Sequence, residues 1–155
     1  MERQAGNTGI AAGETGRKGR MILLIINTAG EKSYMSLYKE NKMIGRKSWL
    51  VEVKAGLKLI ATIEDLLADS HVAVEDIDRI AVHSGPGLRS SFLRVGVVAA
   101  SIMSLANGAE LVSITGEDEE DLVQQAGNKP AVTAIKIMYR DLGWGKANAE
   151  GGKKV

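Results

Sequence analysis

Residues 76–100, DIDRIAVHSGPGLRSSFLRVGVVAA, constrain the fold of this chain more than any other stretch. An apolar strand at 80–83 runs into Gly85-Pro86-Gly87, and a long apolar helix starts near Phe92. A strand, a glycine loop and a helix in this order present backbone N–H groups at a helix N-terminus. The stretch therefore predicts a strand–loop–helix unit whose loop is a candidate ligand site.

Composition excludes several classes of function. The 155 residues contain no cysteine, so disulfides, thiolate metal sites and cysteine nucleophiles are excluded. The formal net charge of +1 and the aromatic content of 4% indicate no general attraction to nucleic acid and few platforms for stacking bases. The apolar run at 21–26 is too short to span a membrane. We expect a cytoplasmic protein without membrane contact.

The apolar periodicity predicts three strands followed by alternating helices and strands. Strands are expected at 21–26, 33–38 and 43–49, with a polar turn at 39–42 between the last two. Helices are expected at 57–67 and 92–105, the second ended by Asn107-Gly108, and strands at 80–82 and 111–114. Three antiparallel strands followed by this alternation predict an α/β fold with a mixed sheet.

The C-terminal part predicts a third helix and a sixth strand. Thr115 and Asp118 have the spacing of a capping box, which would open an acidic helix reaching Gln125. Residues 132–139 alternate, with Ile135, Ile137 and Tyr139 on one side. We expect three regions: a disordered extension at 1–20, a folded domain at 21–127, and a remnant strand with a frayed tail at 128–155.

Residues 21–126 resemble the TsaB (YeaZ) subunit family of bacterial tRNA threonylcarbamoyladenosine synthesis. The resemblance depends on MILLIINT, SWLVEVKAGLKLIATIEDLL, DIDRIAVHSGPG, FLRVGVVAA and GAELVSIT, in this order. It implies a ribonuclease H-like half-domain of the actin-like ATPase and sugar-kinase superfamily. The family continues into a second half-domain, and this chain is expected to be truncated after the first.

Two loops are candidate phosphate-binding sites. They carry Asn27 and Thr28 after the first strand, and Gly85 and Gly87 in the glycine loop. Asn27 stands where nucleotide-hydrolysing members of the superfamily have an Asp, and a neutral amide adds no charge to hold Mg²⁺. The residues from Leu88 to Phe92 also depart from the family loop by one extra residue. We therefore interpret both loops as vestigial and expect no cofactor; the alternative is that all four residues only shape turns.

The sequence contains no recognisable catalytic or metal site. His71 and His83 are the only histidines, they lack helical ligand spacing, and no third ligand is evident. His83 is interpreted as a core residue at a strand end. The catalytic partner of the TsaB family binds metal through paired histidines on its first helix, and residues 54–58 of this chain contain none. We expect no catalytic residue and no bound metal.

The helix at 92–105 is apolar almost all round, which indicates burial on both sides. Its outer side either packs within this chain or contacts another protein. In the family, this helix and the preceding one form the contact with a TsaD-like catalytic subunit, or a homodimer without it. The expected interface residues are Leu59, Ile60, Ile63, Leu67, Arg94, Val95, Val98 and Ile102.

Two functions remain open. The first is a non-catalytic dimerisation or scaffold subunit that supports threonylcarbamoylation of adenosine in tRNA by a TsaD-like partner, touching tRNA only indirectly. The second is an enzyme, either a nucleotide-dependent ATPase or kinase half-domain or a Gcp-like metallopeptidase. The enzyme needs an acidic residue at the first strand end and a second half-domain, so we favour the scaffold.

Overall fold

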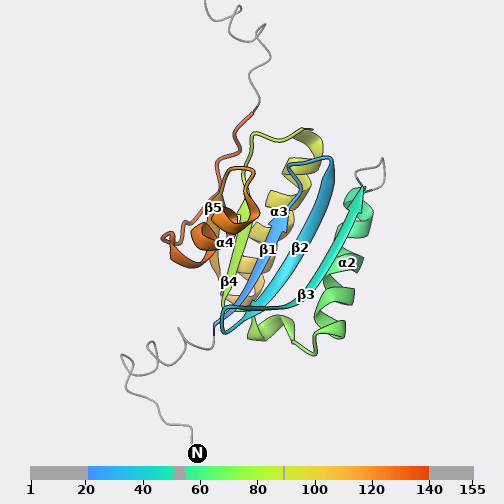
Figure 1. Cartoon of the computed structure of the whole chain (residues 1–155), viewed down its shortest axis with the longest axis vertical. Helices are drawn as coiled ribbons and strands as arrows, with labels where there is room; N and C mark the ends of the chain where they lie inside the picture. Colours follow the sequence, from blue (N-terminus) through green and yellow to red (C-terminus); the bar gives the residue numbers. More distant parts are fainter. Residues whose placement is uncertain (1–20, 51–54, 89, 140–155) are drawn as a thin grey trace, which may run out of the picture.

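The computed structural model describes residues 21–50, 55–88 and 90–139, and contains one five-stranded sheet in the order β3-β2-β1-β4-β5 (Figure 1). The expected extension at 1–20 and the end of the expected tail, 140–155, lie outside the described residues. The strands and helices are β1 Ile22–Asn27, β2 Lys32–Lys39, β3 Lys42–Leu50, α2 Ala55–Asp69, the 3-10 helix η1 Val74–Asp76, β4 Arg79–His83, α3 Ser90–Asn107, β5 Glu110–Ile114 and α4 Glu119–Asn128.

The sheet is mixed, as the sequence predicts. β1 pairs antiparallel with β2, and β2 pairs antiparallel with β3. β4 is parallel to both β1 and β5. The polar turn between β2 and β3 contains Glu40 and Asn41 at φ values of 55° and 67°. Two consecutive left-handed residues match the twist of a tight hairpin, and Asn tolerates that conformation well.

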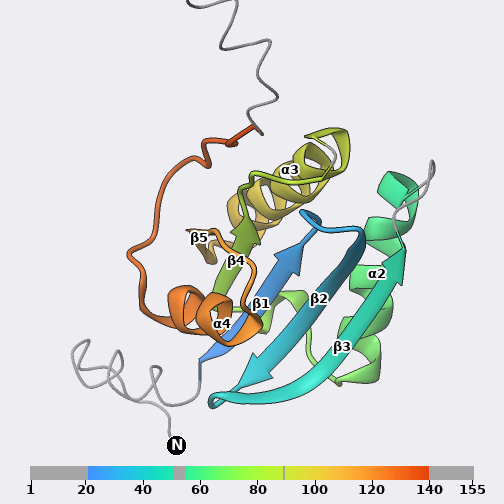
Figure 2. The same cartoon turned by 45° about the horizontal axis from the view of Figure 1, so that its top comes forward.

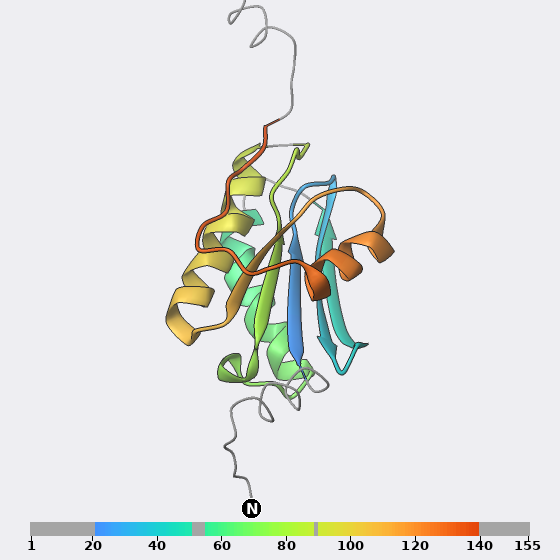
Figure 3. The same cartoon turned by 90° about the vertical axis from the view of Figure 1, so that its left-hand side faces the viewer.

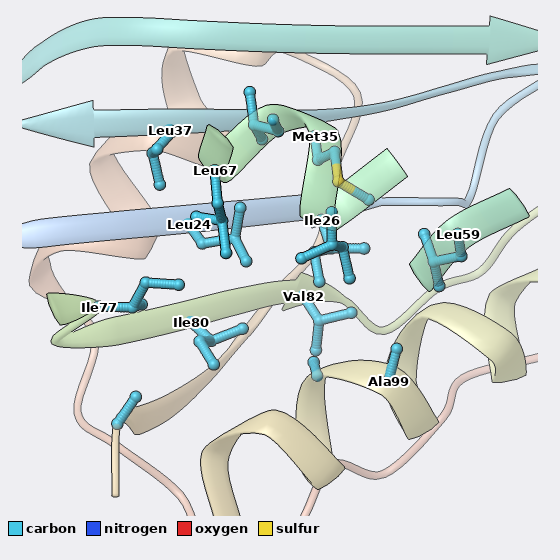
Figure 4. Packing of buried hydrophobic residues seen from close by; sticks show 14 of the residues in the cluster. Leu24, Ile26, Met35, Leu37, Leu59, Leu67, Ile77, Ile80, Val82 and Ala99 are labelled. Carbon is cyan, nitrogen blue, oxygen red and sulfur yellow. The ribbon is translucent and has the colours of Figure 1, made fainter. Parts of the chain in front are cut away.

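Helices cover the sheet on both faces. Figure 3 shows α2 and α3 on one side and α4 on the other. The first side forms the larger core, in which Leu24, Ile26, Ile80 and Val82 from the sheet meet Leu59 and Leu67 of α2 and Ala99 of α3 (Figure 4). The second core, under α4, includes Leu23, Ile25, Leu122 and Ala126. β1 is continuously apolar because its alternate residues face different cores.

Two arginines hold α4 on the sheet. The Arg79 side chain on β4 is 12% exposed and forms a 2.8 Å ion pair with Glu110 on β5. Its guanidinium also donates to the carbonyl oxygens of Ala126 and Lys129, at 3.0 and 2.7 Å. At the other end of α4, Arg46 of β3 forms a 2.7 Å ion pair with Glu119. Arg79 thereby satisfies carbonyls that the end of a helix leaves without partners.

The predicted capping box is wrong. Asp118 is the N-cap of α4, and its side chain accepts a 3.0 Å hydrogen bond from the backbone N–H of Asp121. The N–H of Thr115 instead donates to the side chain of Gln125. The helix starts after Asp118 because this carboxylate caps it directly and Glu119, Glu120 and Asp121 fill a first turn that favours negative charge.

The predicted sixth strand is also wrong. Residues 131–139, here called the strap, make only one isolated bridge to the sheet among the described residues, between Val132 and Leu111. Figure 2 shows the strap leaving α4 and passing outside β5, and Figure 3 shows it rising toward the end of α3, where Tyr139 contacts Arg94. A segment that crosses from one sheet face to the other cannot continue a ladder. Ile135 and Ile137 do pack against the larger core, but Tyr139 is 55% exposed.

Candidate functional site

The fold brings the two predicted loops together. The backbone N–H of Leu88, after the glycine loop, donates a 2.6 Å hydrogen bond to the carbonyl oxygen of Ala29, after β1. Asn27 closes the end of β1 itself, because its Oδ1 accepts from the N–H of Ala29 at 2.9 Å. Parallel strands end at the same edge of a sheet, so β1 and β4 deliver both loops to one place.

The amides of the glycine loop are largely used within the chain. Ser84 donates to Ile114 at 3.0 Å, Gly85 donates to the His83 ring at 3.0 Å, and Leu88 donates to Ala29. Pro86 has no amide to offer. A phosphate cradle needs several free N–H groups that point to one spot. The geometry therefore supports the turn-forming interpretation of Gly85 better than the phosphate-binding one.

Gly85 also lies where no side chain fits. Its φ is 105°, in the left-handed region, and a Cβ would collide with the carbonyl oxygen of Met138 in the strap. The N–H of Met138 donates a 2.7 Å hydrogen bond to the carbonyl oxygen of Ser84. The glycine therefore allows the strap backbone to lie directly on the loop.

Thr28 is buried against α3. Its side chain is 5% exposed, and its Oγ1 has no hydrogen-bond partner. A Cβ at Gly96 would collide with that oxygen, so the missing side chain lets α3 approach the end of β1. Burial of an unpaired hydroxyl costs free energy, so the position is not a favourable one for a hydroxyl unless α3 packs closely on it. Thr28 thus lies at a packing contact in this fold.

His83 fills the end of β4, as the sequence predicts. It is 3% exposed, and its Nδ1 accepts from the Gly85 N–H. The proton must then reside on Nε2, which lies 2.7 Å from the carbonyl oxygen of Gly116 and donates to it. Burial lowers the pKa of His83, and the hydrogen bond to Gly116 opposes this in part. The ring is therefore held neutral and ties β4 to the β5–α4 connection.

No group of three or more His, Asp or Glu side chains in the described ranges is arranged so that it could hold a metal ion. No described helix combines the length and apolar composition needed to cross a bilayer. His71, the other histidine, is an exposed residue at φ 56° in the turn after α2.

Three predicted interface residues lie in the core instead. Leu59, Ile63 and Leu67 of α2 are 1%, 5% and 8% exposed and face the sheet. Their placement on a partner surface is therefore corrected: helical spacing puts them on one face, and the sheet covers that face. Val95 of α3 is half-buried against the same core. Ile60, one position along from Leu59, is 53% exposed.

The opposite side of α3 is open and apolar. Val98, Ile102 and Leu105 are 53%, 60% and 87% exposed. Together with the exposed Arg94 they define the outer face of α3, since residues three and four apart share one side of a helix. Val98 and Ile102, two of the expected interface residues, both point outward. Leu105 was missed, although it lies three positions after Ile102.

Arg94 at the start of this outer face contacts the strap. Its guanidinium carbon lies 5.5 Å from the centre of the Tyr139 ring. Its Nε donates to the Tyr139 hydroxyl at 3.3 Å. Sequence periodicity gives no indication of this contact, because Tyr139 follows Arg94 by 45 residues and belongs to a segment without regular structure.

Known proteins are similar to the part of the chain that contains α2 and α3. The family model of tRNA N6-adenosine threonylcarbamoyltransferase (TsaD) matches residues 56–116. The tRNA N6-adenosine threonylcarbamoyltransferase of Staphylococcus aureus (strain Newman) is 27% identical over 110 residues, covering 61% of this chain and 32% of the relative. The chain thus spans about a third of the length of the curated relatives that it matches.

The fold is that of YeaZ. The structure of YeaZ from Pseudomonas aeruginosa superposes with a TM-score of 0.57 at 21% identity, over 61% of this chain and 44% of YeaZ. A second structure, of a Pseudomonas aeruginosa protein described as similar to peptidase YeaZ, gives the same score and identity. The ribonuclease H-like α/β fold that the resemblance to the TsaB (YeaZ) family implies is thereby confirmed. At this identity the structural likeness establishes the fold alone.

Proposed function

We propose that this chain takes part in tRNA threonylcarbamoylation as a non-catalytic subunit that docks on a TsaD-type enzyme. Both comparisons support this: the sequence is similar to TsaD enzymes, and the fold is that of YeaZ. The match to the TsaD family model covers most of α2 and all of α3. The partner therefore has its own version of this helix pair, which makes contact between like helices a reasonable geometry.

The outer face of α3 is the observation that carries the proposal. The inner face, with Leu93, Val97 and Ala100, already fills the core. Val98, Ile102 and Leu105 add apolar surface that the described part of the chain leaves exposed. Exposed apolar surface on one element usually marks an interface. We propose that the chain contacts the enzyme through this face. We also propose a homodimer in the absence of the enzyme, only indirect contact with tRNA, and a cytoplasmic location.

The proposal also assigns a role to each of the three regions of the chain. Residues 21–127 would be the docking domain, 1–20 an extension without a part in folding, and 128–155 a remnant of a second half-domain. The strap belongs to this last region. The amides of Ser84, Gly85 and Leu88 are engaged within the chain, and this disfavours the alternative of a nucleotide-dependent enzyme.

Copurification tests the proposal. The tagged chain should capture the TsaD-type enzyme of the same organism, and Val98→Glu and Ile102→Glu should not. A carboxylate at either position would be buried without a partner in the contact, at a cost of several kcal/mol. Both positions are exposed in the free chain, so both variants should keep the wild-type melting temperature.

Leu50→Glu is the matched control. Leu50 is 63% exposed and lies on the edge strand β3. Two strands, β2 and β1, separate β3 from β4, the strand on which α3 mainly packs. This variant should bind as the wild type does. A wild-type chain that captures no TsaD-type enzyme, or helix variants that bind as well as the control, would contradict the proposal.

A further inference from the structure

The strap continues the outer face of α3. Tyr139 lies against Arg94, with the guanidinium 5.5 Å from the ring centre. Tyr139 is 55% exposed and its neighbour Met138 is 39% exposed. A guanidinium over an aromatic ring is a favourable contact, which gains strength when water is excluded. Tyr and Arg are also the side chains that contribute most often to binding at the centres of protein interfaces.

The same end of the strap rests on the glycine loop. The N–H of Met138 donates to the carbonyl oxygen of Ser84 at 2.7 Å, and the carbonyl oxygen of Met138 lies where Gly85 has no side chain. Two adjacent strap residues therefore touch two different structures: Met138 contacts the loop after β4, and Tyr139 contacts α3. One peptide unit therefore separates the contact with α3 from the contact with the loop.

The strap is held less firmly than the core. In the described part of the chain, two backbone hydrogen bonds join it to the sheet and the glycine loop, from Val132 to Leu111 and from Met138 to Ser84. Ile135 and Ile137 are only half-buried. A segment with few buried contacts opens locally at a much lower free energy than core strands. Covering its exposed end would therefore change its dynamics measurably.

We propose that Tyr139 belongs to the docking surface, and that the partner which covers the outer face of α3 also covers Tyr139 and holds the strap on the glycine loop. The inference rests on the proposed function, and the partner is the same TsaD-type enzyme. Continuity supports this assignment, because Arg94 forms one end of the apolar outer face and also contacts Tyr139. Binding at α3 is thereby coupled to order at residues 84–88.

The test compares affinities for the purified TsaD-type enzyme of the same organism. Tyr139→Ala should weaken binding about tenfold, a typical loss for an interface aromatic residue. Tyr139→Phe keeps the ring over Arg94 and should bind within about threefold of the wild type, since only one exposed hydrogen bond is lost. Leu50→Ala removes a similarly exposed apolar side chain elsewhere and should bind as the wild type does.

Hydrogen exchange supplies the second measurement. Adding the enzyme to the wild-type chain should slow exchange at the amides of residues 135–139 and 84–88, and in Tyr139→Ala this slowing should be lost at 84–88. If Val98→Glu abolishes binding while Tyr139→Ala binds and exchanges as the wild type does, the inference is overturned and the proposed function stands. If the wild-type chain binds no enzyme, both are overturned.

Discussion

At the scale of single residues, the contact between Thr28 and Gly96 sets how closely α3 approaches β1. The Thr28 hydroxyl is buried without a partner, and a methyl group at position 96 would collide with it. We expect Gly96→Ala to lower the free energy of unfolding by about 1–3 kcal/mol, as overpacking does. Adding Thr28→Ala removes the colliding atom and should recover part of this loss. Urea unfolding of both single variants and the double variant measures the coupling; strictly additive effects would contradict the contact.

His83 makes stability depend on pH. Burial lowers its pKa in the folded chain, whereas the unfolded chain titrates near 6.5. The neutral ring contributes its full stability above about pH 6.5, and the contribution is lost as the pH falls from there toward the lower folded pKa. The slope is at most about 1.4 kcal/mol per pH unit, because one proton is involved.

The urea midpoint should therefore fall between pH 7.5 and 5.5 in the wild type, and less so in His83→Gln. His71→Asn is the matched control: His71 is exposed at φ 56°, where Asn is well tolerated. It replaces the other histidine, which is exposed, and should keep the wild-type urea midpoint at pH 7.5. If His83→Gln and the wild type lose stability in parallel, the neutral buried ring is not its cause.

At the scale of elements, α4 depends on Arg79. This largely buried cation contacts Glu110 and two carbonyl oxygens at the end of the helix. Arg79→Met should destabilise the fold by about 2–3 kcal/mol, the range for hydrogen bonds to charged groups, because the carbonyls lose their partner. Arg79→Lys should recover only part of this lost stability, since an ammonium group lacks the planar, forked set of N–H donors of a guanidinium. Urea unfolding gives both values.

Lys47→Met is the comparison for Arg79. It breaks an exposed ion pair with Asp69 on the opposite side of the sheet from α4, where solvent screens the charges. We expect little change in the urea midpoint. An equal loss of stability in Arg79→Met and Lys47→Met would show that Arg79 has no special part in holding α4.

The sequence predicts regular elements well and tertiary contacts poorly. Each strand that the sequence predicts before residue 130 is present, because β1 to β5 carry apolar runs or alternation bounded by turn residues. The segment 132–139 alternates equally well, but it is a strap. Alternation indicates only that one side of a segment is covered. Ile135 and Ile137 meet this condition by packing on the larger core, without forming a β-ladder.

Long-range contacts account for what was missed at the candidate site. Helical spacing places Leu59, Ile63 and Leu67 on one face, but cannot say whether a sheet or a partner covers it. The pairing of Arg94 with Tyr139 and the contact of Arg79 with the end of α4 join residues 45 or more apart. Only the fold brings such pairs together, so no local pattern predicts them.

At the scale of the whole molecule, we expect the purified chain to hydrolyse neither ATP nor peptides. Asn27 is engaged in closing β1, and the amides of Ser84, Gly85 and Leu88 donate within the chain. Phosphate release and peptide cleavage assays should give rates equal to buffer. Turnover that disappears in Asn27→Ala would contradict this expectation, because contaminating enzymes would be unaffected by the substitution.

The most direct test of the central claim is tRNA threonylcarbamoylation by the TsaD-type enzyme of the same organism, in the presence and absence of this chain. The account predicts that the chain alone modifies no tRNA, that adding it raises the rate of the enzyme, and that Ile102→Glu fails to do so although Leu50→Glu succeeds. An enzyme rate that is the same with the wild-type chain, with Ile102→Glu and with neither would contradict the claim that this chain works by docking on the enzyme through α3.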